Sequence, residues 1–233
     1  MNKLLKWLPI PIVLIVIVVV ILLHSNSSLP TFDVKKEEQV DTAKVKDIIK
    51  LLDDEDKKST AQSELDKLYE GKTRDDLYYL TASKITMETG NDIDAVGTLN
   101  YVKTRSEEYY NLRIRATAGQ FFTLGEVPSD LLNTTLDAAS KYADNIDYQL
   151  LAGKLYYDKD NYTAALYYFD KALQIDEDNV DANYYYALNI YILGEKEEGI
   201  NYMKKAQSLY KGNDKAYKQA MKDYLDVMKE GKR

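Results

Sequence analysis

Cysteine is absent from this 233-residue chain, and histidine occurs once, as His24. Without cysteine the chain can form no disulfide, hold no Cys-ligated zinc, use no catalytic thiolate and carry no acylated cysteine near its N-terminus. With a single imidazole, neither a Ser-His-Asp triad nor a Cys-His pair can be assembled. These absences exclude thiol chemistry and triad-type catalysis.

Phosphate-binding glycine loops are absent as well, because no G-x-x-x-x-G-K or G-x-G-x-x-G pattern occurs. Positive charge is in deficit: 31 Lys and Arg residues oppose 38 Asp and Glu residues, giving a net charge of −7. The lysines are scattered, so binding to nucleic acid has no electrostatic support. The 21 tyrosines, with many Lys, Asn and Ile residues, favour a bacterial source with an AT-rich genome.

Metal and cofactor sites are not predicted either. The stretch from Asp176 to Asp181 is as acidic as a calcium loop, but Val180 stands where a ligand is needed and no glycine follows for the sharp turn. We therefore predict no catalytic, cofactor-binding or metal-ligating residue. The sequence leaves open one enzymatic alternative, a pair of carboxylates acting as in a glycoside or peptide hydrolase.

One long apolar run is present, from Ile10 to Leu23, and it is preceded by Lys3 and Lys6. The stretch from Leu4 to Leu23 would span about 30 Å as a helix, which matches the hydrocarbon core of a bilayer. The positive-inside rule places both lysines in the cytoplasm and the rest of the chain outside. The sequence thus predicts a cytoplasmic N-terminus (residues 1–6), a transmembrane anchor (7–24) and a polar linker (25–39).

A cleaved signal peptide is the alternative interpretation of the same segment. The purely apolar run is short, and Ser25 and Ser27 could provide the small residues of a cleavage site. In that case the protein would be secreted instead of anchored as a single-pass membrane protein.

Small and aromatic residues recur at fixed spacing in the stretch from Gln149 to Asn179. The residues that carry this pattern are Ala152, Gly153, Tyr156, Ala165, Phe169 and Ala172. A window shifted by 34 residues finds a second copy, with Ala187, Ile190, Gly199, Met203 and Ala206 at matching positions. The period and the residue types resemble those of the tetratricopeptide repeat (TPR) family.

The resemblance implies an all-α fold: a TPR-like solenoid of helical hairpins, coiled as a right-handed superhelix and preceded here by the single transmembrane helix. Two positions depart from the family pattern, since Gln149 replaces its tryptophan and Glu177 replaces the proline that usually ends the second helix. The predicted repeats are residues 146–179 and 180–212.

Two degenerate repeats precede them. Residues 76–110 keep Ala82, Ser83, Gly90, Ala95, Leu99 and Val102 at the expected positions, and residues 111–145 keep Ala118, Gly119, Phe122, Leu131 and Ala138. Ser83, Gly119, Gly153 and Ala187 form a ladder of small residues. Such residues are needed where two helix backbones approach closely.

Both ends of the array are expected to be covered. Residues 40–75 predict an N-terminal helical hairpin, with a capping box at Ser59 and Gln62 and a stop at Gly71. Residues 213–230 predict a C-terminal capping helix that starts at Asn213. Polar-faced ends of this kind keep a repeat array soluble.

In the TPR family the first helix of each repeat lines a concave groove. The positions carried over by the resemblance are Leu150, Lys154, Tyr157, Asp158, Tyr184, Leu188, Tyr191 and Ile192. Upstream the matching positions are Leu80, Lys84, Met87, Ala116, Gln120 and Thr123. This mixture of tyrosines and aliphatic residues suits a peptide with apolar anchors.

Three functions remain open on these grounds. The first is a membrane-anchored scaffold whose extracytoplasmic groove binds a segment of a partner envelope protein, supporting an envelope, division or secretion complex. The second is a structural homo-oligomer at the membrane surface. The third is a cell-wall hydrolase or another enzyme, which the lack of catalytic residues disfavours.

Overall fold

The computed structural model describes residues 39–124 and 128–231, with the side chains of 121–124 and 129 left out. The described helices belong to one compact unit, Val40–Arg233. In chain order they are α2 (Thr42–Lys50), the 3₁₀ turn η2 (Leu51–Asp53), α3 (Glu55–Lys58), α4 (Ala61–Leu68), α5 (Asp76–Glu88), α6 (Asp92–Leu99), α7 (Glu107–Leu124), α8 (Ser129–Lys141), α9 (Ile146–Tyr157), α10 (Tyr162–Ile175), α11 (Val180–Leu193), α12 (Lys196–Leu209) and α13 (Lys215–Lys229). The part of the chain described here contains no strand.

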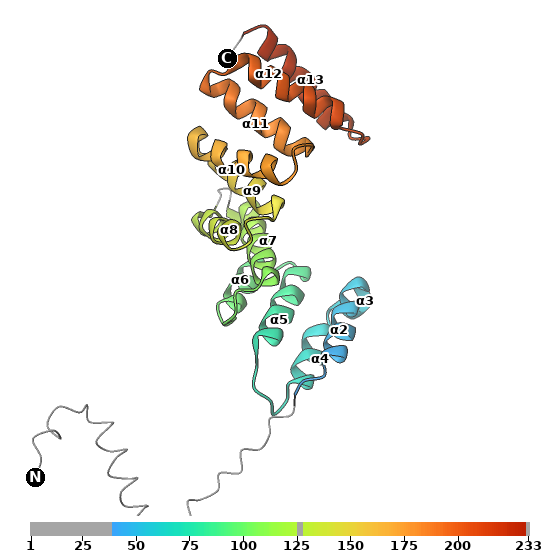
Figure 1. Ribbon diagram of the computed structural model, residues 1–233. Coiled ribbons are helices and arrows are strands. Elements are labelled where there is room, and N and C mark those ends of the chain that lie inside the picture. The colour runs from blue at the N-terminus through green and yellow to red at the C-terminus, as the bar shows by residue number, and fades with distance from the viewer. Residues whose placement is uncertain (1–38, 125–127, 232–233) are drawn as a thin grey trace, which may run out of the picture. The chain divides into compact units, whose positions relative to one another are not determined.

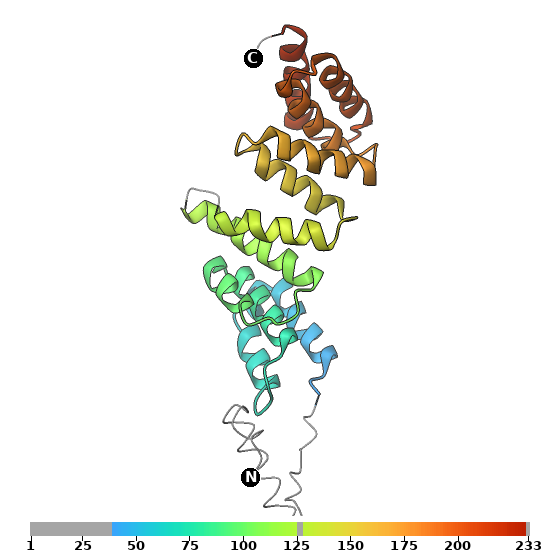
Figure 2. The ribbon, with the colours of Figure 1, turned by 60° about the vertical axis from the view of Figure 1, so that its left-hand side comes forward.

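Consecutive helices from α5 onward pack against each other as antiparallel pairs (Figures 1 and 2). In addition, α5 contacts α7 and α9 contacts α11, so the first helices of successive hairpins lie next to one another. The buried side chains form clusters that follow one another along the chain, as expected when each hairpin covers the apolar face of the next. This arrangement is the predicted all-α solenoid of hairpins.

The hairpin turns share one geometry. Gly90, Asp160 and Gly194 have left-handed φ angles of 85°, 56° and 111°. The amide that follows each of them donates to a carbonyl five residues earlier, for example Asn161 N to Tyr156 O at 2.9 Å and Glu195 N to Ile190 O at 3.0 Å. These bonds satisfy the last carbonyls of the first helix while the chain reverses.

Asparagine starts the second helix in two of these turns. Asn91 accepts a hydrogen bond from Asp94 N at 3.1 Å, and Asn161 accepts one from Ala164 N at 3.2 Å. An N-cap of this kind satisfies a helical amide that has no partner inside the helix. The turns at residues 90–92 and 160–162 therefore share both the left-handed residue and the asparagine N-cap.

The ladder of small residues marks close helix contacts. Ser83 on α5 donates to Ala95 O on α6 at 3.1 Å, and Gly153 on α9 lies against the ring of Phe169 on α10. On α12, a Cβ added to Gly199 would come within 3.0 Å of Ala187 O on α11. Gly119 on α7 differs, because it lies against the Asp92 side chain of the preceding hairpin.

Three local predictions need correction. Helix α7 begins at Glu107, so the predicted repeat boundary at residues 110 and 111 falls inside it. Ser106 explains the earlier start, because its hydroxyl accepts a hydrogen bond from Tyr109 N at 3.2 Å. The last helix is capped not by Asn213 but by Asp214, whose carboxylate accepts from Ala216 N at 2.8 Å.

The third correction concerns the N-terminal hairpin. Ser59 and Gln62 form no capping box, because the short helix α3 occupies the chain just before and α4 starts after Thr60. The Gln62 side chain instead donates to Asp66 Oδ2 at 3.3 Å. Gly71 does follow the end of α4, with a left-handed φ of 71°.

Candidate functional site

An apolar pocket of about 430 Å³ opens between three parts of the C-terminal repeats. The end of α9 and the start of α10 contribute one wall, the end of α11 a second, and α13 a third. The apolar and aromatic residues that line it are Tyr157, Tyr162, Leu188, Tyr191, Ile192, Tyr224, Val227 and Met228. Its volume lies within the range of ligand-binding pockets, about 300–1,000 Å³.

Two of the shared hairpin turns place these walls side by side. The turn at Asp160 brings Tyr157 and Tyr162 together, with ring centroids 5.4 Å apart and the planes at 73°. The turn at Gly194, one repeat later, ends α11 just after Ile192. Because the two turns have the same geometry, the repeat stacking presents both to the same side of the array.

Helix α13 is fixed in place as the third wall. The Tyr191 hydroxyl donates to Met228 O at 3.0 Å, and both side chains are buried. The Tyr184 ring lies edge-on to Tyr217 and Tyr224, at centroid distances of 5.6 Å and 6.1 Å. Apart from Gly194 in the α11–α12 turn, the residues that line the pocket belong to packed helices, which gives a preformed site.

Large apolar side chains at the mouth of this pocket are exposed. Ile192 is 45% exposed, Tyr224 46% and Val227 42%. Isolated surface apolar residues are ordinary, but a cluster around a concave apolar pocket is typical of an interaction site.

Tyr157, on the wall formed by α9 and α10, is uncharged at neutral pH. Burial, followed by the neighbouring Tyr162 and Tyr224, raises the pKa of Tyr157 to about 12. Its hydroxyl can therefore donate or accept a hydrogen bond without carrying charge. This wall therefore suits a partner that packs apolar groups on the Tyr157 ring and forms a hydrogen bond with its hydroxyl.

The structure divides the eight predicted groove residues into two sets. Tyr157, Leu188, Tyr191 and Ile192 line the pocket. The other four do not line it. Leu150 and Tyr184 are buried between helices, and Asp158 is exposed at the end of α9. The ammonium group of Lys154 already has partners within the fold. Lys154 Nζ lies 3.3 Å from Asp181 Oδ2 and 4.4 Å from the centre of the Tyr185 ring.

The upstream groove positions are mostly covered. Leu80, Met87 and Ala116 are buried, and Lys84 and Gln120 are half-buried. The side chain of Thr123 lies outside those that the structure describes.

Four pocket residues, Tyr162, Tyr224, Val227 and Met228, did not follow from the groove positions of the family. Tyr224, Val227 and Met228 lie on the last helix, for which the sequence predicts only a capping role. The sequence does contain a signal for this part of the pocket. Met221, Leu225 and Met228 are the buried residues of α13, and Val227 is a further apolar residue that this buried face does not need.

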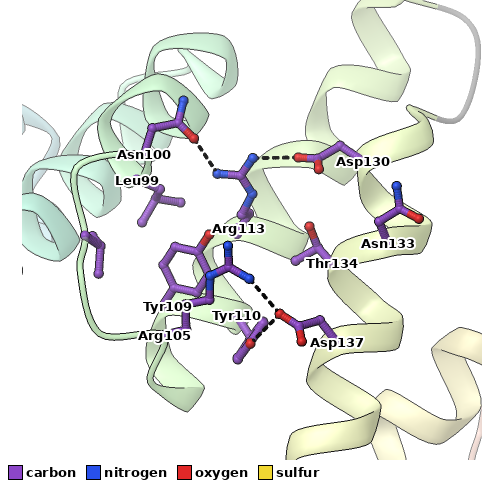
Figure 3. Close-up of a pocket in the computed structure, with 11 residues that line it drawn as sticks. Leu99, Asn100, Arg105, Tyr109, Tyr110, Arg113, Asp130, Asn133, Thr134 and Asp137 are labelled. Atoms are coloured by element: carbon purple, nitrogen blue, oxygen red, sulfur yellow. Dashed lines mark hydrogen bonds and ion pairs between the residues drawn. The ribbon is translucent and has the colours of Figure 1, made fainter.

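A second, polar pocket of about 440 Å³ lies between α6, α7 and α8 (Figure 3). Arg113 bridges it, donating to Asn100 Oδ1 at 2.8 Å and to Asp130 Oδ2 at 2.7 Å. Asp137 accepts from Tyr110 Oη at 2.7 Å and from Arg105 Nη1 at 2.9 Å. These bonds join α8 to the helix and loop before it.

Both carboxylates of the polar pocket form ion pairs with arginines of the fold. The Tyr110 hydroxyl, and then Arg105, lower the pKa of Asp137, which keeps it ionised and unable to act as a general acid. Asp130 forms an ion pair with Arg113. The bonds in this pocket therefore serve to join helices, and they give no support to a hydrolase.

Carboxylates in the acidic stretch from Asp176 to Asp181 also have partners within the fold. Asp176 accepts from Asp178 N at 3.1 Å, Asp178 pairs with Lys205, and Asp181 accepts from Tyr217 and Lys154. Among the residues described, no group of three or more His, Cys, Asp or Glu side chains could hold a metal ion.

The predicted anchor (7–24), its flanking lysines, His24 and nearly all of the linker lie outside the described residues. Within residues 39–124 and 128–231, no helix combines the length and the apolar character needed to cross a membrane.

Comparison with known proteins identifies the fold. No protein-family model and no curated protein matches the chain. Among solved structures, YrrB, described as a TPR protein with an unusual peptide-binding site, is 15% identical with a TM-score of 0.61, over 80% of this chain and 94% of its own. MamA is 19% identical with a TM-score of 0.55, over 66% of this chain and 89% of its own. At these identities the likeness establishes a TPR-like, all-α repeat fold and nothing finer.

Proposed function

We propose that this chain is a membrane-anchored scaffold whose extracytoplasmic TPR surface binds a segment of a partner envelope protein. Such binding would support the assembly or regulation of an envelope, division or secretion complex. The observation that carries the proposal is the preformed apolar pocket, with Ile192, Tyr224 and Val227 exposed at its mouth. A solvent-exposed apolar pocket with rigid walls is stabilised when a partner's side chain fills it.

Peptide binding by a similar fold supports this choice. The solved structure of YrrB is described as containing an unusual peptide-binding site. Helical repeats offer extended surfaces for this purpose. The pocket here is formed by the ends of successive repeat helices together with α13.

The anchoring part of the proposal rests on the sequence. The apolar run from Ile10 to Leu23, with Lys3 and Lys6 before it, would place the repeats on the outer side of the membrane. Extracellular protease added to intact cells should degrade the repeat domain if this topology is correct. N-terminal sequencing of the mature protein separates the two interpretations, since a cleaved signal peptide leaves a chain that starts near Ser27.

Site-specific photo-crosslinking in native membranes tests the binding function. A photoreactive amino acid replaces Ile192 or Val227 in the full-length chain. We expect a discrete adduct with another protein at both positions, because both side chains lie at the mouth of the pocket.

Matched controls use Ile93 on α6 and Ile175 on α10, which are exposed apolar residues away from the pocket. Equal crosslinking at all four positions would refute a specific pocket. Adducts with twice the mass of the chain would instead favour the homo-oligomer, in which the pocket receives a second copy.

A further inference from the structure

We propose that the segment bound in the apolar pocket is basic, with Lys or Arg residues close to its apolar anchor. The inference rests on the function proposed above and names the chemistry of the partner. It follows from the distribution of charge around the pocket.

Carboxylates without partners lie directly beside the pocket. A second hollow of about 550 Å³ shares Gly194 and Lys196 with it and is lined also by Glu195, Glu197 and Glu198. All three glutamates are exposed, and their carboxylates form no hydrogen bond or ion pair with any residue that the structure describes.

The turn on the other wall is also acidic. Asp158 and Asp160 flank Lys159 between α9 and α10, and Asp160 accepts a hydrogen bond from the pocket residue Tyr162 at 2.6 Å. In the second turn the only cation is Lys196, which lies 5.7 Å from the centre of the Tyr191 ring. The first turn (residues 158–160) and residues 195–198 at the start of α12 together present five carboxylates and two ammonium groups around an apolar opening.

The polar pocket of the earlier repeats shows the opposite arrangement. There Asp130 pairs with Arg113 and Asp137 with Arg105, so the negative charges are compensated inside the fold. Glu197 and Glu198 lie in the first turn of α12, where they favour the helix dipole, but no cation of the fold forms an ion pair with them among the described residues. Uncompensated negative charge at the rim of an interface attracts a positively charged partner and disfavours a negatively charged one.

The geometry also suits a basic side chain next to an apolar one. A Leu, Phe or Trp side chain could enter the pocket between Tyr157 and Ile192, while a neighbouring Lys or Arg reaches the glutamates of the second turn. The Tyr224 ring, on a residue that is 46% exposed, could contribute a cation–π contact to a guanidinium group.

Peptide display on the full-length chain in lipid nanodiscs tests this inference. Random dodecapeptides displayed on phage are selected against the loaded nanodiscs, with empty nanodiscs as the background. We expect the selected peptides to combine large apolar residues with Lys or Arg, and we expect their affinity to fall as the salt concentration rises.

Three pairs of substitutions, one of them a control, separate the charge from the pocket. Glu197→Gln with Glu198→Gln should weaken the selected peptides by about two- to twentyfold, since each exposed charge pair is worth little alone. The control pair, Glu108→Gln with Asp147→Asn, removes first-turn carboxylates from α7 and α9 and should leave binding unchanged. Ile192→Ser with Val227→Ser should abolish binding.

The outcomes distinguish this inference from the function on which it rests. Neutral or acidic peptides that bind through Ile192 and Val227 would overturn the basic partner but leave peptide binding intact. Binding that survives the Ile192→Ser and Val227→Ser changes, or no enrichment over empty nanodiscs, would overturn both. A dimer in sedimentation that is lost on Ile192→Ser would identify a second copy as the occupant and overturn the basic segment.

Discussion

Gly153 on α9 lies directly against the fully buried ring of Phe169 on α10. A Cβ at position 153 would come within 2.6 Å of Phe169 Cδ1, which is closer than side chains pack. The contact joins the two helices of the best-preserved repeat. Its substitution therefore tests the packing that the repeat pattern predicts.

Gly153→Ala should lower the free energy of unfolding by about 1–2 kcal/mol, because overpacking a core exceeds the gain of alanine in a helix. The measurement is urea unfolding of the full-length chain followed by far-UV circular dichroism. Gly97→Ala on α6 is the control, since nothing lies within 4 Å of a Cβ there. That change should stabilise by about 0.5–1 kcal/mol. Equal effects of both substitutions would contradict the close contact.

Asp137 should make the free energy of unfolding depend on pH in the acid range, because it joins α8 to α7 and to the loop before α7. The Tyr110 hydroxyl, then Arg105, lower the pKa of Asp137 in the folded chain. A lowered pKa stabilises the fold above the unfolded value, about 3.9, and the stabilisation is lost as the pH falls through the folded pKa. The side chain is 47% exposed, so the effect is reduced by solvent.

Asp137→Asn should therefore reduce stability at pH 7 by up to about 1 kcal/mol, and the difference from the unmodified chain should close below about pH 4. Urea unfolding at a series of pH values gives the comparison. Asp144→Asn is the control, because Asp144 is exposed. A difference that persists unchanged at low pH would show that the carboxylate charge is not involved.

Buried and half-buried tyrosines should make the fold sensitive to alkali. Burial raises the pKa of Tyr148, Tyr157 and Tyr186 to about 12. A raised pKa stabilises the fold below the unfolded value, about 10, and this contribution is lost as the pH rises toward 12.

Phenolate absorbance of the folded chain should therefore lag behind that of the urea-unfolded chain between about pH 10 and 12. Tyr157→Phe should remove one phenol of raised pKa without changing the titration of the others. If folded and unfolded chains titrate together, these phenols are not buried.

The repeat pattern places Gly153 and Phe169 among the positions where small and aromatic residues pack the helices of a repeat, and the structure brings the two into contact. The turns at Gly90 and Asp160 follow from the same pattern, since an asparagine N-cap succeeds each of them. Such local features need only the period and the chemistry of the turn.

The full pocket could not be predicted from the sequence, because α13 is not a repeat helix and its contacts depend on packing. Val227 occupies an exposed position on that helix, which a stripe of buried residues does not reveal. Lys154 was expected in the groove, but Asp181 and the Tyr185 ring hold it in place. The position of such a side chain depends on tertiary contacts, which the spacing of residues in the sequence does not reveal.

Gln149, which replaces the tryptophan of the family, forms a cap between repeats. Its buried side-chain amide donates to Ala139 O at 2.9 Å and to Ala143 O at 3.0 Å, at the end of α8. Asn183, one repeat later, donates to Glu177 O at 2.8 Å and to Asn179 O at 2.7 Å. The amide oxygens of both side chains have no partner among the described residues, so the donors carry the interaction.

Gln149→Met should therefore lower the free energy of unfolding by about 1–3 kcal/mol, because it leaves carbonyls at the end of α8 without a donor. Asn183→Leu should have a similar cost at the α10–α11 junction. Hydrogen exchange provides the decisive comparison: Gln149→Met should accelerate exchange near residues 141–146 and Asn183→Leu near residues 175–180. Each variant thus controls for the other. Faster exchange at both junctions in either variant would mean that the array loosens as a whole and that the two amides do not act as local caps.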